Sequence, residues 1–188
     1  VQWVVNAYVL SLAAFALIGG SLADRIGRRA VFNAGCAVFA FASLACALAP
    51  SLGLLTVARF AQGIGAALLT PASLALLSSV YPKAERGAAI GAWAAASAIT
   101  AAGGPVLGGW LTERFGWPSI FFLNLPLAVV AVALALRYAP DARAVETVKR
   151  SLDWTGAALA AAGFGLAAFG LVALGEGRGT GGPSPALL

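Results

Sequence analysis

The sequence predicts an all-α membrane protein that crosses the bilayer several times. Of its 188 residues, 61% are hydrophobic and only 10% are charged, whereas a soluble domain carries about 25% charged residues. Several uncharged apolar runs are long enough to cross a bilayer, which takes about 20 helical residues. This composition gives no support to a soluble catalytic domain or to a nucleic-acid-binding surface, so the lipid bilayer is the expected partner.

The apolar runs predict six membrane-spanning helices. They cover residues 3–22, 30–49, 52–80, 88–111, 118–137 and 154–175. Pro50 and Ser51 separate the second span from the third, and a longer polar stretch follows the fifth. We therefore expect an N-terminal helix bundle at 1–138, a connector at 139–153, and a further helix with the start of another at 154–188.

The lysines and arginines predict the orientation, because cytoplasmic connectors are enriched in these residues. Most of the 12 lie in the connectors at 23–29, 82–87 and 137–153, whereas the alternate connectors hold only Arg114 and Arg178. We expect the three basic connectors to be cytoplasmic and the protein to lie in the plasma or inner membrane. The sequence contains no methionine, which predicts an internal fragment of a longer chain.

Residues suited to metal binding or catalysis are scarce. Cys36 and Cys46 fall on different faces of one predicted helix, so we expect them to pack as small apolar residues. Histidine is absent, which excludes imidazole metal ligands and histidine proton relays within this sequence. There is also no pair of acidic residues in the middle of a span, so we expect neither an enzyme nor a metal site.

A polar connector with two glycines links the first two spans. Irregular backbone facing lipid would leave amide groups unpaired, so we expect the whole stretch 20–29 to be a connector at the membrane surface. It resembles the G-x-L-a-D-r-x-G-r-r/k signature between helices 2 and 3 of the major facilitator superfamily of secondary transporters. The resemblance implies a gating role for its polar and glycine residues, which are Gly20, Asp24, Arg25, Gly27, Arg28 and Arg29. A plain turn with a basic flank is the alternative, although it would not explain Asp24 or the glycines.

Arg59 lies within the span 52–80, where an arginine costs about 2.5–3.5 kcal/mol on insertion scales and is a functional candidate. Gln62, Thr70 and Ser73 follow near the same helix face, which predicts a wall facing a watery cavity. Arg59, Gln62 and Gly63 resemble the superfamily's fourth-helix pattern R-x-x-q-G, which implies a role in proton coupling. The alternative is that Arg59 extends to the outer end of the helix, roughly 10 Å away.

Arg59 itself cannot carry the proton, because a guanidinium stays protonated in proteins. It can instead favour the ionised form of a nearby carboxylate. Every Asp and Glu of the sequence lies at a predicted helix end or in a connector. We therefore expect the group that binds the proton to lie outside this sequence.

The fourth span contains a proline flanked by glycines. Gly104, Pro105, Gly108 and Gly109 resemble the G-P-x-x-G-G element of the superfamily's fifth helix, which is associated with antiporters. Proline bends a helix, and glycines four residues apart create a flat face for close packing. Thr100 stands where the family pattern usually has a further glycine. A kinked packing helix without a role in transport is the alternative.

The stretch 116–126 resembles the G-W-r-w-I-F-F-x-N-x-P sequence that enters helix 6 in the fourteen-helix drug:proton antiporter branch, with Pro118 and Ser119 in place of arginine and tryptophan. The short connector before residues 152–156 resembles the entry to that branch's extra helix pair. The resemblance covers nearly the whole chain, from helix 2 into the start of helix 8. It implies a partial major facilitator fold, with about six of fourteen helices present and helix 1 missing.

These resemblances imply a secondary active exporter of small hydrophobic or cationic compounds, of the multidrug type, that works by alternating access. The expected energy source is the proton gradient, without a cofactor. The expected partners are protons, a small-molecule substrate and the rest of the protein's own chain. The alternatives are a proton-coupled importer or exporter of a specific metabolite, and a membrane scaffold without transport.

Overall fold

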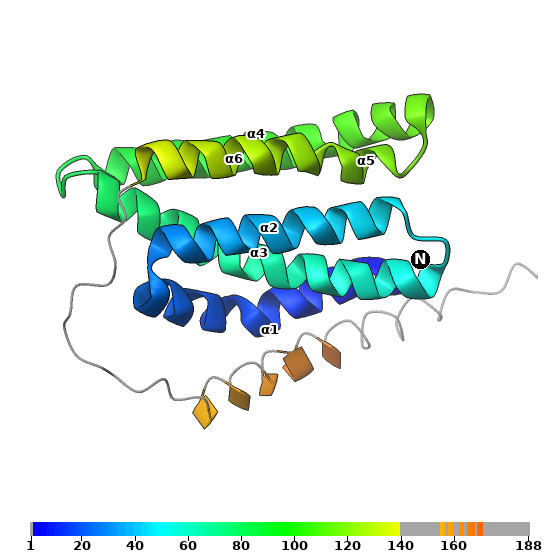
Figure 1. Cartoon of the computed structure of the whole chain (residues 1–188), viewed down its shortest axis with the longest axis horizontal. Coiled ribbons are helices and arrows are strands. Elements are labelled where there is room, and N and C mark those ends of the chain that lie inside the picture. Colours follow the sequence, from blue (N-terminus) through cyan, green and yellow to red (C-terminus); the bar gives the residue numbers. More distant parts are fainter. Residues whose placement is uncertain are drawn as a thin grey trace, which may run out of the picture.

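The computed structural model describes residues 2–139 and part of 155–170, and its regular elements in that part of the chain are helices (Figure 1). They are α1 (Gln2–Ile26), α2 (Arg28–Ala47), α3 (Leu52–Val80), α4 (Arg86–Phe115), α5 (Ser119–Phe122) and α6 (Asn124–Tyr138). Among the described residues, five stretches are long and apolar enough to cross a membrane, with α5 and α6 forming one of them together. The all-α membrane fold is therefore confirmed.

The ends of the spans agree with the sequence prediction at some places and differ at others. The predicted span 52–80 coincides with α3. The predicted connector 139–153 lies outside the described residues beyond Ala139, and so do most of 154–188. The described residues of 155–170 are helical, and there the Phe169 ring centroid is 6.0 Å from that of Trp3 in α1.

The expectation of an irregular connector over residues 20–29 is wrong. Helix α1 continues to Ile26 and α2 begins at Arg28, so only Gly27 interrupts the helices. The φ angle of Gly27 is 112°, in a backbone region that residues with a Cβ rarely adopt. The helix continues past residue 22 because Ala23 is buried in a core cluster with Val31 of α2 and Ala72 of α3.

Helix α3 is the centre of the bundle. It packs along α1 and α2, and α6 lies against α2. Figure 1 shows that α1, α3 and α6 end at the side of the molecule where α2 and α4 begin. This alternation places the 23–29 and 82–87 connectors and the end of α6 together, as predicted. The assignment of that side to the cytoplasm stays a prediction.

Small residues allow the helices around α3 to approach closely. A Cβ at Gly63 would meet Ser11 Oγ and the Tyr8 carbonyl oxygen of α1, and a Cβ at Gly65 would lie 2.6 Å from the Phe39 nitrogen of α2. Cys36 and Cys46 are buried free thiols in α2, as expected of packing residues. Helix α4 differs, because it has no buried residue and contacts only α3 and α5 among the described helices.

Candidate functional site

The Arg59 guanidinium lies at the junction of α1, α3 and α5. Its Nε donates to the Val4 carbonyl oxygen at 3.3 Å, and its Nη1 donates to Gln62 Oε1 at 2.8 Å. The guanidinium carbon is 4.3 Å from the centroid of the Tyr8 ring and 5.9 Å from that of Phe121. Cation–π contacts and hydrogen bonds of this kind offset part of the cost of placing an arginine in a span.

Gln62 continues this set of contacts into the neighbouring helices. Its Nε2 donates to Ser43 Oγ of α2 at 2.6 Å, and Asn124 Nδ2 of α6 donates to the same oxygen at 3.3 Å. Gln62 is 1% exposed and Ser43 is 0% exposed. We call Arg59, Gln62, Ser43 and Asn124 the polar relay. It connects α2, α3 and α6 by side chains alone, and Arg59 adds α1 and α5.

The structure differs from the expected cavity wall at Gln62 and Gly63. Both are buried, because Gln62 faces Ser43 in α2 and Gly63 lies against α1. Thr70 and Ser73, the other members of the predicted stripe, do line a cavity. Gln62 thus faces α2 and Gly63 faces α1, whereas Thr70 and Ser73 face the cavity that α4 and α6 also line.

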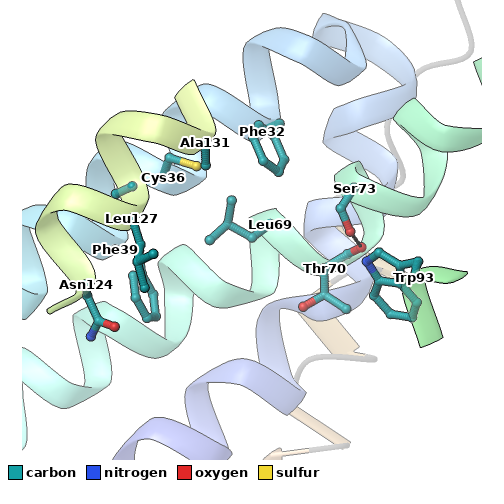
Figure 2. Close-up of a pocket in the computed structure, with 11 residues that line it drawn as sticks. Phe32, Cys36, Phe39, Leu69, Thr70, Ser73, Trp93, Asn124, Leu127 and Ala131 are labelled. Atoms are coloured by element: carbon teal, nitrogen blue, oxygen red, sulfur yellow. Dashed lines mark hydrogen bonds between the residues drawn. The ribbon is translucent and has the colours of Figure 1, made fainter. Parts of the chain in front are cut away.

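The cavity has a volume of about 340 Å³ and lies between α2, α3, α4 and α6. Figure 2 shows Phe32, Cys36 and Phe39 on one wall, Thr70 and Ser73 near Trp93, and Asn124 at one end. Its lining is almost entirely apolar, which suits a hydrophobic occupant. Asn124 belongs both to this lining and to the polar relay.

The residues of the 20–29 signature lie where α1, α2, α3 and α6 meet. Asp24 Oδ1 and Arg28 Nη2 form an ion pair at 4.0 Å. Arg28 Nη1 donates to the Ala75 carbonyl oxygen of α3 at 3.1 Å, and Arg29 Nη1 donates to the Ala139 carbonyl oxygen after α6 at 3.2 Å. A Cβ at Gly20 would make an ordinary 3.7 Å contact with Pro71. The signature therefore joins ends of helices that carry the polar relay.

The glycines of α4 face open space in the described part of the chain. A Cβ at Gly104 or Gly109 would meet no atom within 4 Å, and one at Gly108 would meet only the Ile120 side chain, at 3.7 Å. Pro105 lies inside α4, which continues as one helix to Phe115. The structure thus brings Arg59 and Gln62 together and leaves the α4 element apart from them.

Sequence reasoning missed Tyr8, Ser43 and Asn124 as members of the site. Asn124 carried a usable signal, because a polar amide in an apolar span is expensive and most often faces a protein partner. Ser43 and Tyr8 carried none, since each is a single residue within a run of small or apolar residues.

The described part of the chain is a bundle of long apolar helices with a hydrogen-bonded arginine inside a span, an arrangement typical of membrane proteins that have a polar pathway. The chain belongs to the Major Facilitator Superfamily, whose family model matches residues 1–175. The long apolar helices of the described residues agree with a multi-pass membrane protein of this family.

Several relatives have names that describe resistance or transport. The chain is 45% identical over 141 residues to the multidrug resistance protein Stp of Mycobacterium tuberculosis (strain CDC 1551 / Oshkosh), covering 74% of this chain and 26% of the relative. It is 45% identical over 168 residues to the methylenomycin A resistance protein of Streptomyces coelicolor, which covers 87% of this chain and 35% of the relative. It is 38% identical over 140 residues to the riboflavin transporter RibZ of Clostridioides difficile, which covers 74% of this chain and 31% of the relative. The chain thus spans about a third or less of their length.

Proposed function

We propose that the full-length protein exports small hydrophobic or cationic compounds in exchange for protons, by alternating access in the cell membrane. The observation that carries the proposal is the position of Arg59, a charged side chain held inside a span by neutral acceptors and aromatic rings. None of these contacts neutralises its charge. Such a cation can favour the ionised form of a carboxylate that binds and releases protons. The proposal takes its energy from the proton gradient and not from a bound cofactor.

The names of the relatives support export of drug-like compounds, since two of those compared above are resistance proteins. The apolar cavity between α2, α3, α4 and α6 supports a hydrophobic cargo. In this proposal the signature at 20–29 acts as a gate on the cytoplasmic side. Asp24, Arg28 and Arg29 make contacts that can break as helix ends move, and the Pro105 element of α4 belongs to the antiport mechanism.

The test is energised dye efflux from cells that lack their own pumps and express the full-length parent gene. Wild type, Arg59→Ala and the control Arg114→Ala are loaded with a fluorescent cationic dye, with and without a protonophore. Arg114 is an exposed arginine in the last turn of α4. We expect protonophore-sensitive efflux that Arg59→Ala abolishes and Arg114→Ala retains, at equal membrane abundance. Efflux that persists in Arg59→Ala would contradict the role of Arg59.

A second candidate function is the transport of one specific metabolite. The riboflavin transporter among the relatives favours it. The test is a varied panel of dyes and a set of metabolites in the same cells. If no dye is exported and a single metabolite shows a saturable flux, metabolite transport replaces drug export as the proposed function.

A further inference from the structure

We propose that Ser43 and Asn124 are positioning residues for Arg59 and act on it through Gln62. This inference rests on the proposed function, because Arg59 is the residue through which that function works. It assigns roles to two side chains, in α2 and α6, that lie far from Arg59 in the sequence. The relay also joins Arg59 to the wall of the apolar cavity, where Asn124 lies (Figure 2).

The orientation of the Gln62 amide follows from the chemistry of its neighbours. Arginine has only donors, so the Gln62 atom 2.8 Å from Arg59 Nη1 must be the acceptor Oε1. The Nε2 donor of Gln62 then necessarily faces Ser43 Oγ, 2.6 Å away. In this orientation the Nε2 donor of Gln62 needs an acceptor at position 43, so Ser43 favours the orientation in which Oε1 faces Arg59.

Ser43 is suited to this task because a hydroxyl oxygen can accept more than one hydrogen bond. It accepts from Gln62 Nε2 and from Asn124 Nδ2 at the same time. A side chain without an acceptor at position 43 would leave the buried Nε2 donor of Gln62 unpaired, which is costly. Asn124 is at the outer limit of this contact, at 3.3 Å, so its contribution is the smaller one.

The remaining contacts of Arg59 do not determine its position as closely. Val4 provides a backbone oxygen at 3.3 Å, and Tyr8 and Phe121 provide ring faces. A ring face accepts a cation over a range of positions. Without Gln62, the long side chain could move toward the outer end of α3. The relay is therefore what keeps Arg59 within the bundle.

The test compares Ser43→Ala with Ser11→Ala in the full-length protein. Both serines are fully buried, but Ser11 Oγ donates only to the Ala7 and Tyr8 carbonyl oxygens of its own helix. We expect Ser43→Ala to lower kcat/KM for dye efflux about tenfold, the effect of leaving a buried donor unpaired. We also expect Ser43→Ala and Arg59→Lys to shift the pH profile of dye efflux in the same direction. We expect Ser11→Ala to leave the profile unchanged.

Two further comparisons separate positioning from a structural role. The double variant Ser43→Ala/Arg59→Lys should transport no more slowly than the slower single variant, because residues that act through one another are not additive. Asn124→Ala should shift the pH profile of efflux less than Ser43→Ala does. Asn33→Ala is the control and should leave the profile unchanged, since the buried Asn33 Oδ1 has no partner in the described part of the chain. Additive effects, or lost abundance with an unchanged pH profile, would overturn the inference.

A readout independent of transport keeps the relay testable if no dye is exported. Cys46 Sγ is fully buried and lies 4.0 Å from Gln62 Oε1. In a background where Cys46 is the only cysteine, Ser43→Ala should raise its rate of alkylation about tenfold, because Gln62 is released. Equal rates in Ser43→Ala and Ser11→Ala would refute the relay. Faster labelling without any efflux in wild type would instead remove the proposed function and retain the relay.

Discussion

Helices α3 and α4 are both rich in glycine, but among the described residues close packing occurs at glycines of α3 and not at those of α4. At Gly63 and Gly65 the backbones of α1 and α2 approach so closely that a Cβ would collide with them. At Gly103, Gly104 and Gly109 of α4, a Cβ would meet no described atom within 4 Å. The two helices have similar lengths, and each contains an internal proline. The difference lies in the neighbours that each has in the described part of the chain.

This difference shows that a small-residue pattern permits close approach but does not produce it. In lipid, helices associate through contact and hydrogen bonding rather than through the hydrophobic effect, so a flat face needs a matching partner. The partners of α3 are α1 and α2, and the polar relay forms where they meet. We expect the glycine face of α4 to contact the rest of the full-length chain.

The largest effect is expected for Gly63→Leu. A side chain at position 63 would collide with Ser11 and with the Tyr8 backbone, so α1 and α3 would have to separate. We expect little folded protein in the membrane, measured as abundance and as thermal stability in detergent. The matched control is Gly103→Leu, where no atom lies within 4 Å in the described residues. Equal abundance of the two variants would remove the contrast between α3 and α4.

A smaller effect is expected for Gly65→Ala. The new Cβ would lie 2.6 Å from the Phe39 nitrogen and 2.9 Å from its Cα, and overpacking of this kind costs about 1–3 kcal/mol of stability. At Gly53 of the same helix, a Cβ would meet nothing within 4 Å in the part of the chain that the structure describes. Gly53→Ala should therefore be neutral or slightly stabilising, because alanine favours helix. Thermal unfolding of the purified full-length proteins measures the stability of each variant. A stable Gly65→Ala would contradict the close packing of α2 on α3.

In α4, Gly108→Leu should impair transport more than folding. Only Ile120 lies near position 108, at 3.7 Å, so the described bundle can accommodate the change with little loss of stability. If the glycine face contacts the rest of the protein during transport, a leucine there will block that contact. We expect normal membrane abundance with dye efflux lowered about tenfold or more, because overpacking at a helix contact costs about 1–3 kcal/mol. Reduced abundance with normal turnover per molecule would contradict this.

The smallest effect on stability is expected for Asp24→Asn. The Asp24 side chain is 72% exposed, and its ion pair with Arg28 is long, at 4.0 Å. Exposed ion pairs contribute about 0–1 kcal/mol to the stability of the folded protein. Insertion and thermal stability should be unchanged, while turnover falls if the pair is part of the gate. Full transport by Asp24→Asn, at equal abundance, would remove Asp24 from the gate.

The sequence predicted the fold closely where the signal was local. The span 52–80 agrees with α3 at both ends, since Ser51 caps the helix by accepting from the Leu54 nitrogen at 3.3 Å and Pro82 follows its end. The connector at 20–29 was predicted less well. Its polar residues suggested irregular backbone, but burial of Ala23 against Val31 and Ala72 keeps α1 helical to Ile26.

The candidate site was predicted in part. Arg59 and Gln62 were identified because polar residues within a span are costly and stand out, and their spacing of three residues allows their hydrogen bond. The direction in which Gln62 points was not predictable. It depends on Ser43, whose position relative to α3 is not a property of the sequence near Gln62.

The sequence by itself determined the class of protein, the spans of the described part to within a few residues, and the candidate arginine. These depend on hydrophobicity over about 20 neighbouring residues, which is a local quantity. The tertiary structure alone decided which glycines pack, which residues join Arg59, and that Ser43 and Asn124 meet although they are 81 residues apart. Those contacts depend on how the helices are placed next to one another, because a polar atom in a membrane pairs with whichever partner packing brings within reach.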